Sequence, residues 1–115
     1  MNSIVLGKLS QWGCDVDGAL ERCVNDEEFY IDCLKSFMTD VNFEQLDFDL
    51  KNKDFVGAFE AAHSLKGVTA NLGITPLFDS ISVLVDRLRN GFYEDNEKYY
   101  DAIYNDYHYF LNILQ

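Results

Sequence analysis

The chain has 115 residues, a length that suits one domain and is too short for two ordinary ones. It is 48% hydrophobic and has 20 acidic against 9 basic residues, which gives a formal net charge of −11. Such a surface repels nucleic-acid phosphates and anionic lipids, so we expect neither nucleic acid nor a membrane as a partner. No apolar run approaches the roughly 20 residues of a membrane span, and the N-terminus lacks a signal-peptide pattern. We therefore expect one cytoplasmic domain over residues 1–115.

Cysteine usage excludes the common metal and dithiol motifs. Cys14, Cys23 and Cys33 are odd in number and widely spaced, and no C-x-x-C pair is present. We expect free thiols that are buried or half-buried, and no metal site or cofactor of the chain's own.

The first third of the sequence predicts short helices. A first apolar stripe ends at Gly13, and it comprises Ile4, Val5, Leu9 and Trp12. Asp15 has the position of an N-cap for a second short helix that stops at Asn25, and Asp26 has that position for the segment EEFYIDCLKSFM. The apolar stripe of this third helix has helical spacing, at Tyr30, Leu34, Phe37 and Met38.

Three helices are predicted in the middle of the chain. Asn42 is a candidate N-cap for FEQLDFDLK, in which Phe43, Leu46 and Leu50 form the apolar stripe. Asp54 precedes a long segment from Phe55 to Leu72, which Gly73 closes as a helix-ending glycine. Thr75 followed by Pro76 predicts a new helix that ends at Gly91, with its apolar stripe at Leu77, Ile81, Leu84, Val85 and Leu88.

The last segment has the most regular pattern of the chain. Its apolar residues step by alternating threes and fours, at Tyr100, Ile103, Tyr104, Tyr107, Phe110, Leu111 and Leu114. This narrow seam is typical of helices that pack at shallow angles, and we expect its tyrosine rings in the core. No segment alternates with period two. We predict an all-α fold, an antiparallel four-helix bundle over about residues 26–113 with a short helical extension over residues 1–25.

The segment from Phe55 to Leu72 carries an unusual polar side. At about 100° per residue, one arc faces the core, with Phe55, Ala58, Ala62, Leu65, Thr69 and Leu72. His63 projects about 130° away from the centre of that arc, so we expect it to be exposed. Its helical neighbours carry little charge for so acidic a protein, namely Val56, Phe59, Glu60, Lys66, Gly67 and Ala70.

Gly67 and Lys66 suggest why this side is unusual. A glycine inside a helix lowers helix stability by about 1 kcal/mol relative to alanine, and core packing does not require one on this exposed side. Its missing side chain gives a partner access to His63, and Lys66 places an ammonium group nearby. An exposed histidine is mostly neutral at pH 7 and has one ring nitrogen free to attack an electrophile. The pattern indicates a nucleophilic histidine whose partner brings the remaining machinery, because no phosphate-binding loop or catalytic triad is present.

The segment Ala62-His63-Ser64-Leu65-Lys66-Gly67, followed by Asn71-Leu72-Gly73 and Leu77, resembles the signature of histidine-containing phosphotransfer (HPt) domains. The resemblance extends over about residues 26–113, and the lead-in with Trp12, Gly13 and Asp15 is similar to that of free-standing bacterial members. It implies a four-helix bundle that carries phosphate on His63 between receiver domains, with Lys66 stabilising charge and Gly67 giving access.

The resemblance also implies the partners. These are receiver domains of response regulators, a hybrid histidine kinase, or both, with Mg²⁺ held by the receiver, and we expect the protein itself to be a monomer. We predict a receiver-docking surface around His63, formed by Val56, Phe59, Glu60, Ser64, Ala70 and Asn71, to which Phe43 or Leu46 can add. Glu60 either repels the phosphoryl group or hydrogen-bonds the second imidazole nitrogen.

Two other functions compete with this one. The first is an adaptor or inhibitor that docks a kinase or response regulator without being phosphorylated. The second is an enzyme that uses His63 as an acid or base, which would need convergent polar groups in a pocket. Because the surroundings of His63 look convex and apolar, we do not expect an enzyme. We expect the other histidine, His108, to be structural or on the surface.

Overall fold

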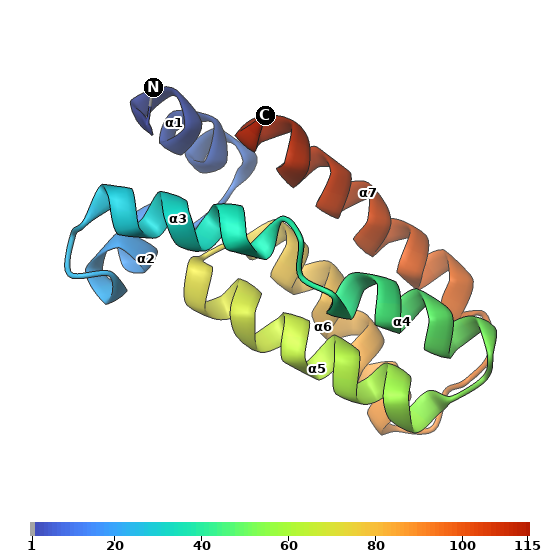
Figure 1. Ribbon diagram of the computed structural model, residues 1–115. Helices are drawn as coiled ribbons and strands as arrows, with labels where there is room; N and C mark the ends of the chain where they lie inside the picture. The colour runs from blue at the N-terminus through green and yellow to red at the C-terminus, as the bar shows by residue number, and fades with distance from the viewer. Residues whose placement is uncertain (1) are drawn as a thin grey trace.

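The computed structural model describes residues 2–115, and within that range the chain is helical with no strand (Figure 1). The all-α prediction is therefore confirmed, and every predicted segment forms a helix. The helices are α1 (Asn2–Trp12), α2 (Val16–Arg22), α3 (Glu27–Phe37), α4 (Asn42–Lys51), α5 (Phe55–Leu72), α6 (Thr75–Arg89) and α7 (Asn96–Leu114). No helix among these residues is long and apolar enough to cross a membrane.

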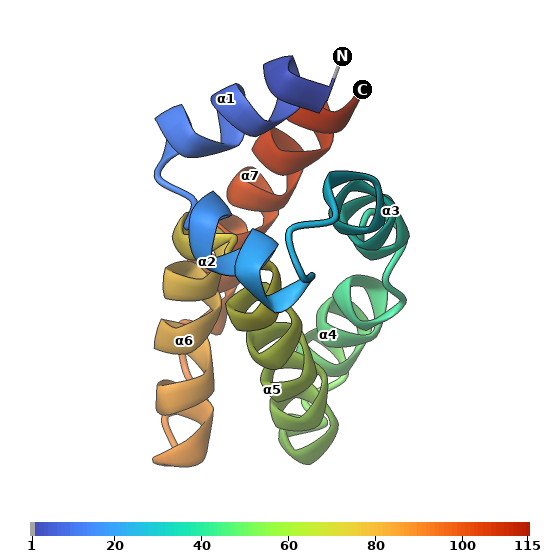
Figure 2. The same ribbon diagram turned by 90° about the vertical axis from the view of Figure 1, so that its left-hand side faces the viewer.

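The long helices pack side by side around one elongated core. Helix α5 lies between α4 and α6 and packs against both, α6 packs against α7, and α7 also touches α4 (Figure 2). Helix α1 lies along α7, so the first helix and the end of the last one share one end of the molecule (Figure 1). The body measures 41 × 23 × 21 Å. Its largest fully buried side chains come from six of the helices and the turn before α6, and they include Leu9, Tyr30, Leu46, Leu65, Ile74, Ile81 and Phe110.

Several predicted helix ends are confirmed by their hydrogen bonds. The carboxylates of Asp15, Asp26 and Asp54 each accept a hydrogen bond from the backbone N–H three residues later, at 3.0–3.1 Å. These bonds satisfy donors that the first helical turn leaves free. Gly73 ends α5 with φ +70°, in the left-handed region that favours glycine.

The predicted N-caps Asn42 and Thr75 are wrong. Both residues are the first of their helices, preceded by Val41 and Ile74, which give no side-chain capping bond. At α4 the carboxylate of Asp40 accepts the hydrogen bond from the N–H of Asn42, at 2.8 Å. The amide of Asn42 is therefore free to reach α5. Helix α6 ends at Arg89, two residues before the predicted end at Gly91.

The predicted apolar stripes hold for the central helices and fail in part at the two ends of the chain. Ile4 is exposed, because α1 faces its neighbours through Leu6 and Leu9 instead. In α7 the buried apolar residues are Ile103, Phe110 and Ile113, and the Tyr104 ring is about half exposed. The predicted tyrosine core is thus wrong for Tyr104, since this side of α7 is only partly covered by α4.

The three cysteines are free and half-buried, as predicted. Burial raises the pKa of Cys14 to about 12 despite a hydrogen bond from the backbone of Thr75. This thiol therefore stays protonated at neutral pH, and it contributes to packing as a small apolar group.

Candidate functional site: the exposed side of helix α5

Helix α5 turns the predicted arc toward the core. Ala58, Ala62, Leu65 and Thr69 are fully buried, and the Thr69 hydroxyl donates to the Leu65 carbonyl one turn earlier, at 2.9 Å. Phe55, at the start of the helix, is half-buried. Because the arc is fixed over five turns, the opposite side of α5 must face solvent.

His63 lies in the middle of that outer side and is exposed, as predicted. Its imidazole ring stacks on Phe59, one turn earlier, with the ring centroids 5.6 Å apart and the planes 28° apart. Within the described residues, no hydrogen bond joins Glu60 to His63, so the suggested support of the second ring nitrogen by Glu60 is not formed. The stack fixes one face of the ring and leaves its edge open to a partner.

Lys66 and Gly67 shape the approach to the ring. The Lys66 ammonium lies 5.9 Å from the centroid of the Phe78 ring on α6, and neither ion pair found within residues 2–115 involves it. Gly67 is exposed, and a Cβ atom added there would meet nothing within 4 Å. Packing therefore does not require this glycine, and the space in front of it is open.

Neighbouring helices contribute contacts that the sequence did not reveal. The Arg89 guanidinium, at the end of α6, lies 5.6 Å from the centroid of the Phe59 ring that supports His63. On the other side, the Asn42 side chain of α4 donates a hydrogen bond to the Ser64 hydroxyl, at 3.3 Å. Both contacts join residues far apart in the chain, and no pattern within a single helix could have predicted them.

The predicted docking residues share one face. Val56 is 73% exposed, Phe59 is half-buried beside His63, and the remaining four are exposed on the same side of α5, namely Glu60, Ser64, Ala70 and Asn71. The possible contribution of Phe43 or Leu46 is wrong, because both side chains are buried against the core. Phe43 packs against the rings of Phe37 on α3 and Tyr107 on α7, and Leu46 is fully buried in the core.

The N-terminal helices hold the end of α5 in place. The Arg22 side chain of α2 donates to the carbonyls of Asn71 and Ala70, at 2.8 and 3.1 Å, and the buried Tyr30 hydroxyl of α3 donates to the Leu72 carbonyl at 2.7 Å. These bonds satisfy carbonyls that the last turn of a helix leaves free. The segment over residues 1–25 thus helps to position the helix that carries His63.

His108 is exposed on α7, where its ring lies 4.2 Å from that of Tyr104. Within residues 2–115, no group of three or more His, Cys, Asp or Glu side chains is arranged to hold a metal ion.

The outer side of α5 therefore presents one accessible imidazole, an open space one turn away and two nearby cations, Lys66 and Arg89. Comparison of the chain with family models, with curated proteins and with solved structures finds no match. The residues and their geometry alone support a functional interpretation.

Proposed function

We propose that the protein is a phosphorelay intermediate of the HPt type, in which His63 accepts a phosphoryl group from a receiver-domain phospho-aspartate and passes it to the aspartate of another receiver. The observation that carries this proposal is the open space at Gly67, one turn from an exposed imidazole. A glycine inside a helix lowers stability by about 1 kcal/mol relative to alanine, and no packing contact requires one at position 67. Access of a partner protein to His63 would explain why a glycine stands at this position.

The transfer step uses few groups of this chain. The free ring nitrogen of neutral His63 attacks the phosphorus atom, a P–N bond forms, and the P–O bond to the donor aspartate breaks. The donor carboxylate leaves as an anion, and the second ring nitrogen keeps its proton. Lys66, three residues after His63 and outside the ion pairs of the described chain, offsets the negative charge of the phosphoryl group. Mg²⁺ belongs to the receiver partner.

The packing order supports the finer architecture that this function implies. Each of α4, α5, α6 and α7 touches two others of the set, which favours a four-helix bundle. In this architecture α3 lies at the start of the bundle region, and α1 and α2 form the N-terminal extension over residues 1–25. An exposed helix side suits docking of a folded partner better than capture of a small molecule. The free cysteines suit the reducing cytoplasm, where we place the protein.

Intact mass measured at alkaline pH tests the proposal, because phosphohistidine is labile to acid. The wild type, His63→Gln and the control His108→Gln are each mixed with a receiver domain phosphorylated on its aspartate. We expect one phosphoryl group on the wild type and on His108→Gln, and none on His63→Gln.

Two results would contradict the proposal. Phosphate retained by His63→Gln would place the acceptor elsewhere. Binding of several phosphorylated receivers without any transfer would favour the adaptor function instead, with the same α5 face serving only as a docking surface.

A further inference from the structure

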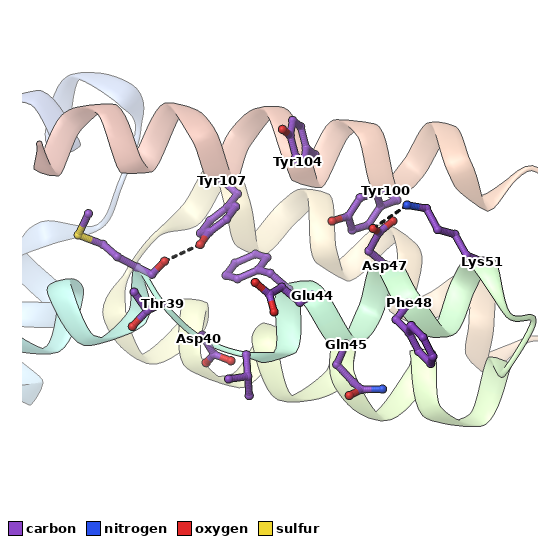
Figure 3. A pocket seen from close by; sticks show the side chains of 13 residues that line it. Thr39, Asp40, Glu44, Gln45, Asp47, Phe48, Lys51, Tyr100, Tyr104 and Tyr107 are labelled. Atoms are coloured by element: carbon purple, nitrogen blue, oxygen red, sulfur yellow. Dashed lines mark hydrogen bonds and ion pairs between the residues drawn. The ribbon is translucent and has the colours of Figure 1, made fainter.

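A groove of about 810 Å³ runs between α4 and α7 (Figure 3). Tyr100, Tyr104 and Tyr107 line it from α7, and Phe48 lines it from α4. Helix α5 also packs against α4, but no residue of α5 lines the groove. A ligand in this groove would therefore leave the outer side of α5 free.

The groove offers aromatic surface in fixed positions. The rings of Phe43 and Tyr107 stack with centroids 3.8 Å apart, and the Tyr107 hydroxyl donates to the Met38 carbonyl. Phe48 and Tyr104 remain 62% and 49% exposed at its walls. Large apolar rings left open to water on a folded domain are typical of interaction surfaces.

Carboxylates accompany these rings along the whole groove. Asp40, Glu44 and Asp47 line it, against the single cation Lys51. An adjoining hollow of about 450 Å³ shares Asp47 and Lys51 and adds Glu97 and Asp101 from α7. Five carboxylates thus face one ammonium group, which is an excess of four negative charges.

Two local features concern the charged groups of the groove. The Lys51 ammonium lies 2.9 Å from an Asp47 carboxylate oxygen, so a groove carboxylate already binds an amine. Burial, followed by the charge of Asp47, raises the pKa of Tyr100 to about 12, and burial with the charges of Glu44 and Asp40 raises that of Tyr107. Burial is the larger cause at both tyrosines, and the neighbouring carboxylates add to it.

We propose that the groove between α4 and α7 docks a basic segment of a partner protein, whose Lys or Arg side chains lie on the tyrosine and phenylalanine rings and pair with the groove carboxylates. Aromatic faces and carboxylates both attract the charged groups of Lys and Arg. The aromatic rings also offer apolar surface on which the aliphatic part of these side chains can pack. Complementary charge also speeds the encounter of the partners. This docking does not depend on phosphorylation of His63.

The test uses a fluorescent peptide that alternates arginine and leucine, with the same peptide carrying glutamate in place of arginine as a negative probe. Binding to the full chain is measured by fluorescence anisotropy, and amide chemical shifts locate the site. We expect binding of the arginine peptide only, with shifts confined to the region of residues 38–51 and 97–107.

Matched variants distinguish binding in the groove from general attraction of the peptide to an acidic protein. The double variant Glu44→Gln, Asp47→Asn and the control Glu21→Gln, Asp32→Asn lower the negative charge by the same amount, the control at exposed sites on α2 and α3. We expect about tenfold weaker binding for the groove variant and little change for the control, with unchanged helical content for both.

Tyr104→Ala tests the aromatic part, and we expect it to weaken binding as well. Absence of binding, shifts spread over all acidic surfaces, or an equal loss in the control variant would overturn the proposal. Transfer of phosphate to His63 remains intact in the groove variant if the two surfaces are separate, so failure of one proposal does not imply failure of the other.

Discussion

Glycines 7 and 67 form a natural matched pair that separates helix stability from partner access. Each lies exposed inside a helix, Gly7 in α1 and Gly67 in α5, and a Cβ atom at either position would meet nothing within 4 Å. Replacing either glycine therefore introduces no clash within the molecule. Only Gly67 has a histidine one turn away, so the pair separates the open space itself from its position beside an imidazole.

The variants Gly7→Gln and Gly67→Gln have equal expected effects on stability. Glycine is about 1 kcal/mol less favourable than alanine inside a helix, and glutamine is nearly as good as alanine. Each substitution should therefore raise the free energy of unfolding by roughly 0.5–1 kcal/mol, which corresponds to a rise of a few degrees in Tm. Circular dichroism at 222 nm during thermal and denaturant unfolding measures both quantities.

The same variants differ in their expected effect on phosphotransfer. Side chains four residues apart on a helix have Cβ atoms about 5–6 Å from each other, so the glutamine of Gly67→Gln reaches the space beside the His63 ring. We expect the initial rate of transfer from a phosphorylated receiver to fall at least about tenfold, equivalent to about 1.4 kcal/mol of activation free energy. Gly7→Gln should transfer at the wild-type rate.

Either of two results would refute a role for the open space at Gly67. Wild-type transfer by Gly67→Gln would show that the open space is not used by the partner. Equal slowing in both variants would show that the effect comes from the helix rather than from access. A lower unfolding free energy for Gly67→Gln would contradict the absence of contacts around this glycine.

Four further outcomes follow from burial and hydrogen bonding. His63→Gln should change the free energy of unfolding by less than about 0.5 kcal/mol in urea, because the ring is exposed. Leu65→Ala, two residues later and fully buried, should lower it by about 2–5 kcal/mol in the same assay. Tyr30→Phe removes the buried hydroxyl that donates to the Leu72 carbonyl, and equilibrium unfolding should show a loss of about 1–3 kcal/mol. Because the pKa of Tyr100 rises from 10.0 to about 12 on folding, the folded chain keeps a proton that the unfolded chain loses, so stability should fall as the pH rises from 10 to 12. Denaturant titrations across that range should give a shallower fall for Tyr100→Phe.

Local features of the fold could be predicted because their physical causes lie within a few residues. The Asp26 carboxylate, for example, bonds an N–H only three positions away, and Gly73 ends α5 through its own backbone angle. The apolar arc of α5 has enough turns to fix which side faces inward. The exposure of His63 follows directly from that arc.

Features that depend on neighbouring helices could not be predicted in this way. Asn42 looks like an N-cap in the sequence, but Asp40 makes the local bond and Asn42 bonds Ser64 on α5. Tyr104 continues the seam of α7, yet α4 covers that seam only in part, and the ring lies at the wall of a groove. The sequence pattern shows that a seam exists and does not show how far its partner helix extends along it.

The distribution of charge explains how an acidic protein can still accept an anionic phosphoryl group at His63. Charges separated by more than about 10 Å are largely screened at physiological salt, so the net charge of −11 matters less at His63 than the groups within a turn or two. There, the Lys66 ammonium lies near the Phe78 ring and joins neither ion pair of the described residues. The Arg89 guanidinium lies near the Phe59 ring and pairs with Asp86 of its own helix, and Glu60 adds one exposed carboxylate. The carboxylates instead concentrate between α4 and α7. The outer side of α5 is therefore suited to a phosphoryl group and the groove to a cation, and Asp40 lines both the groove and the hollow beside Gly67.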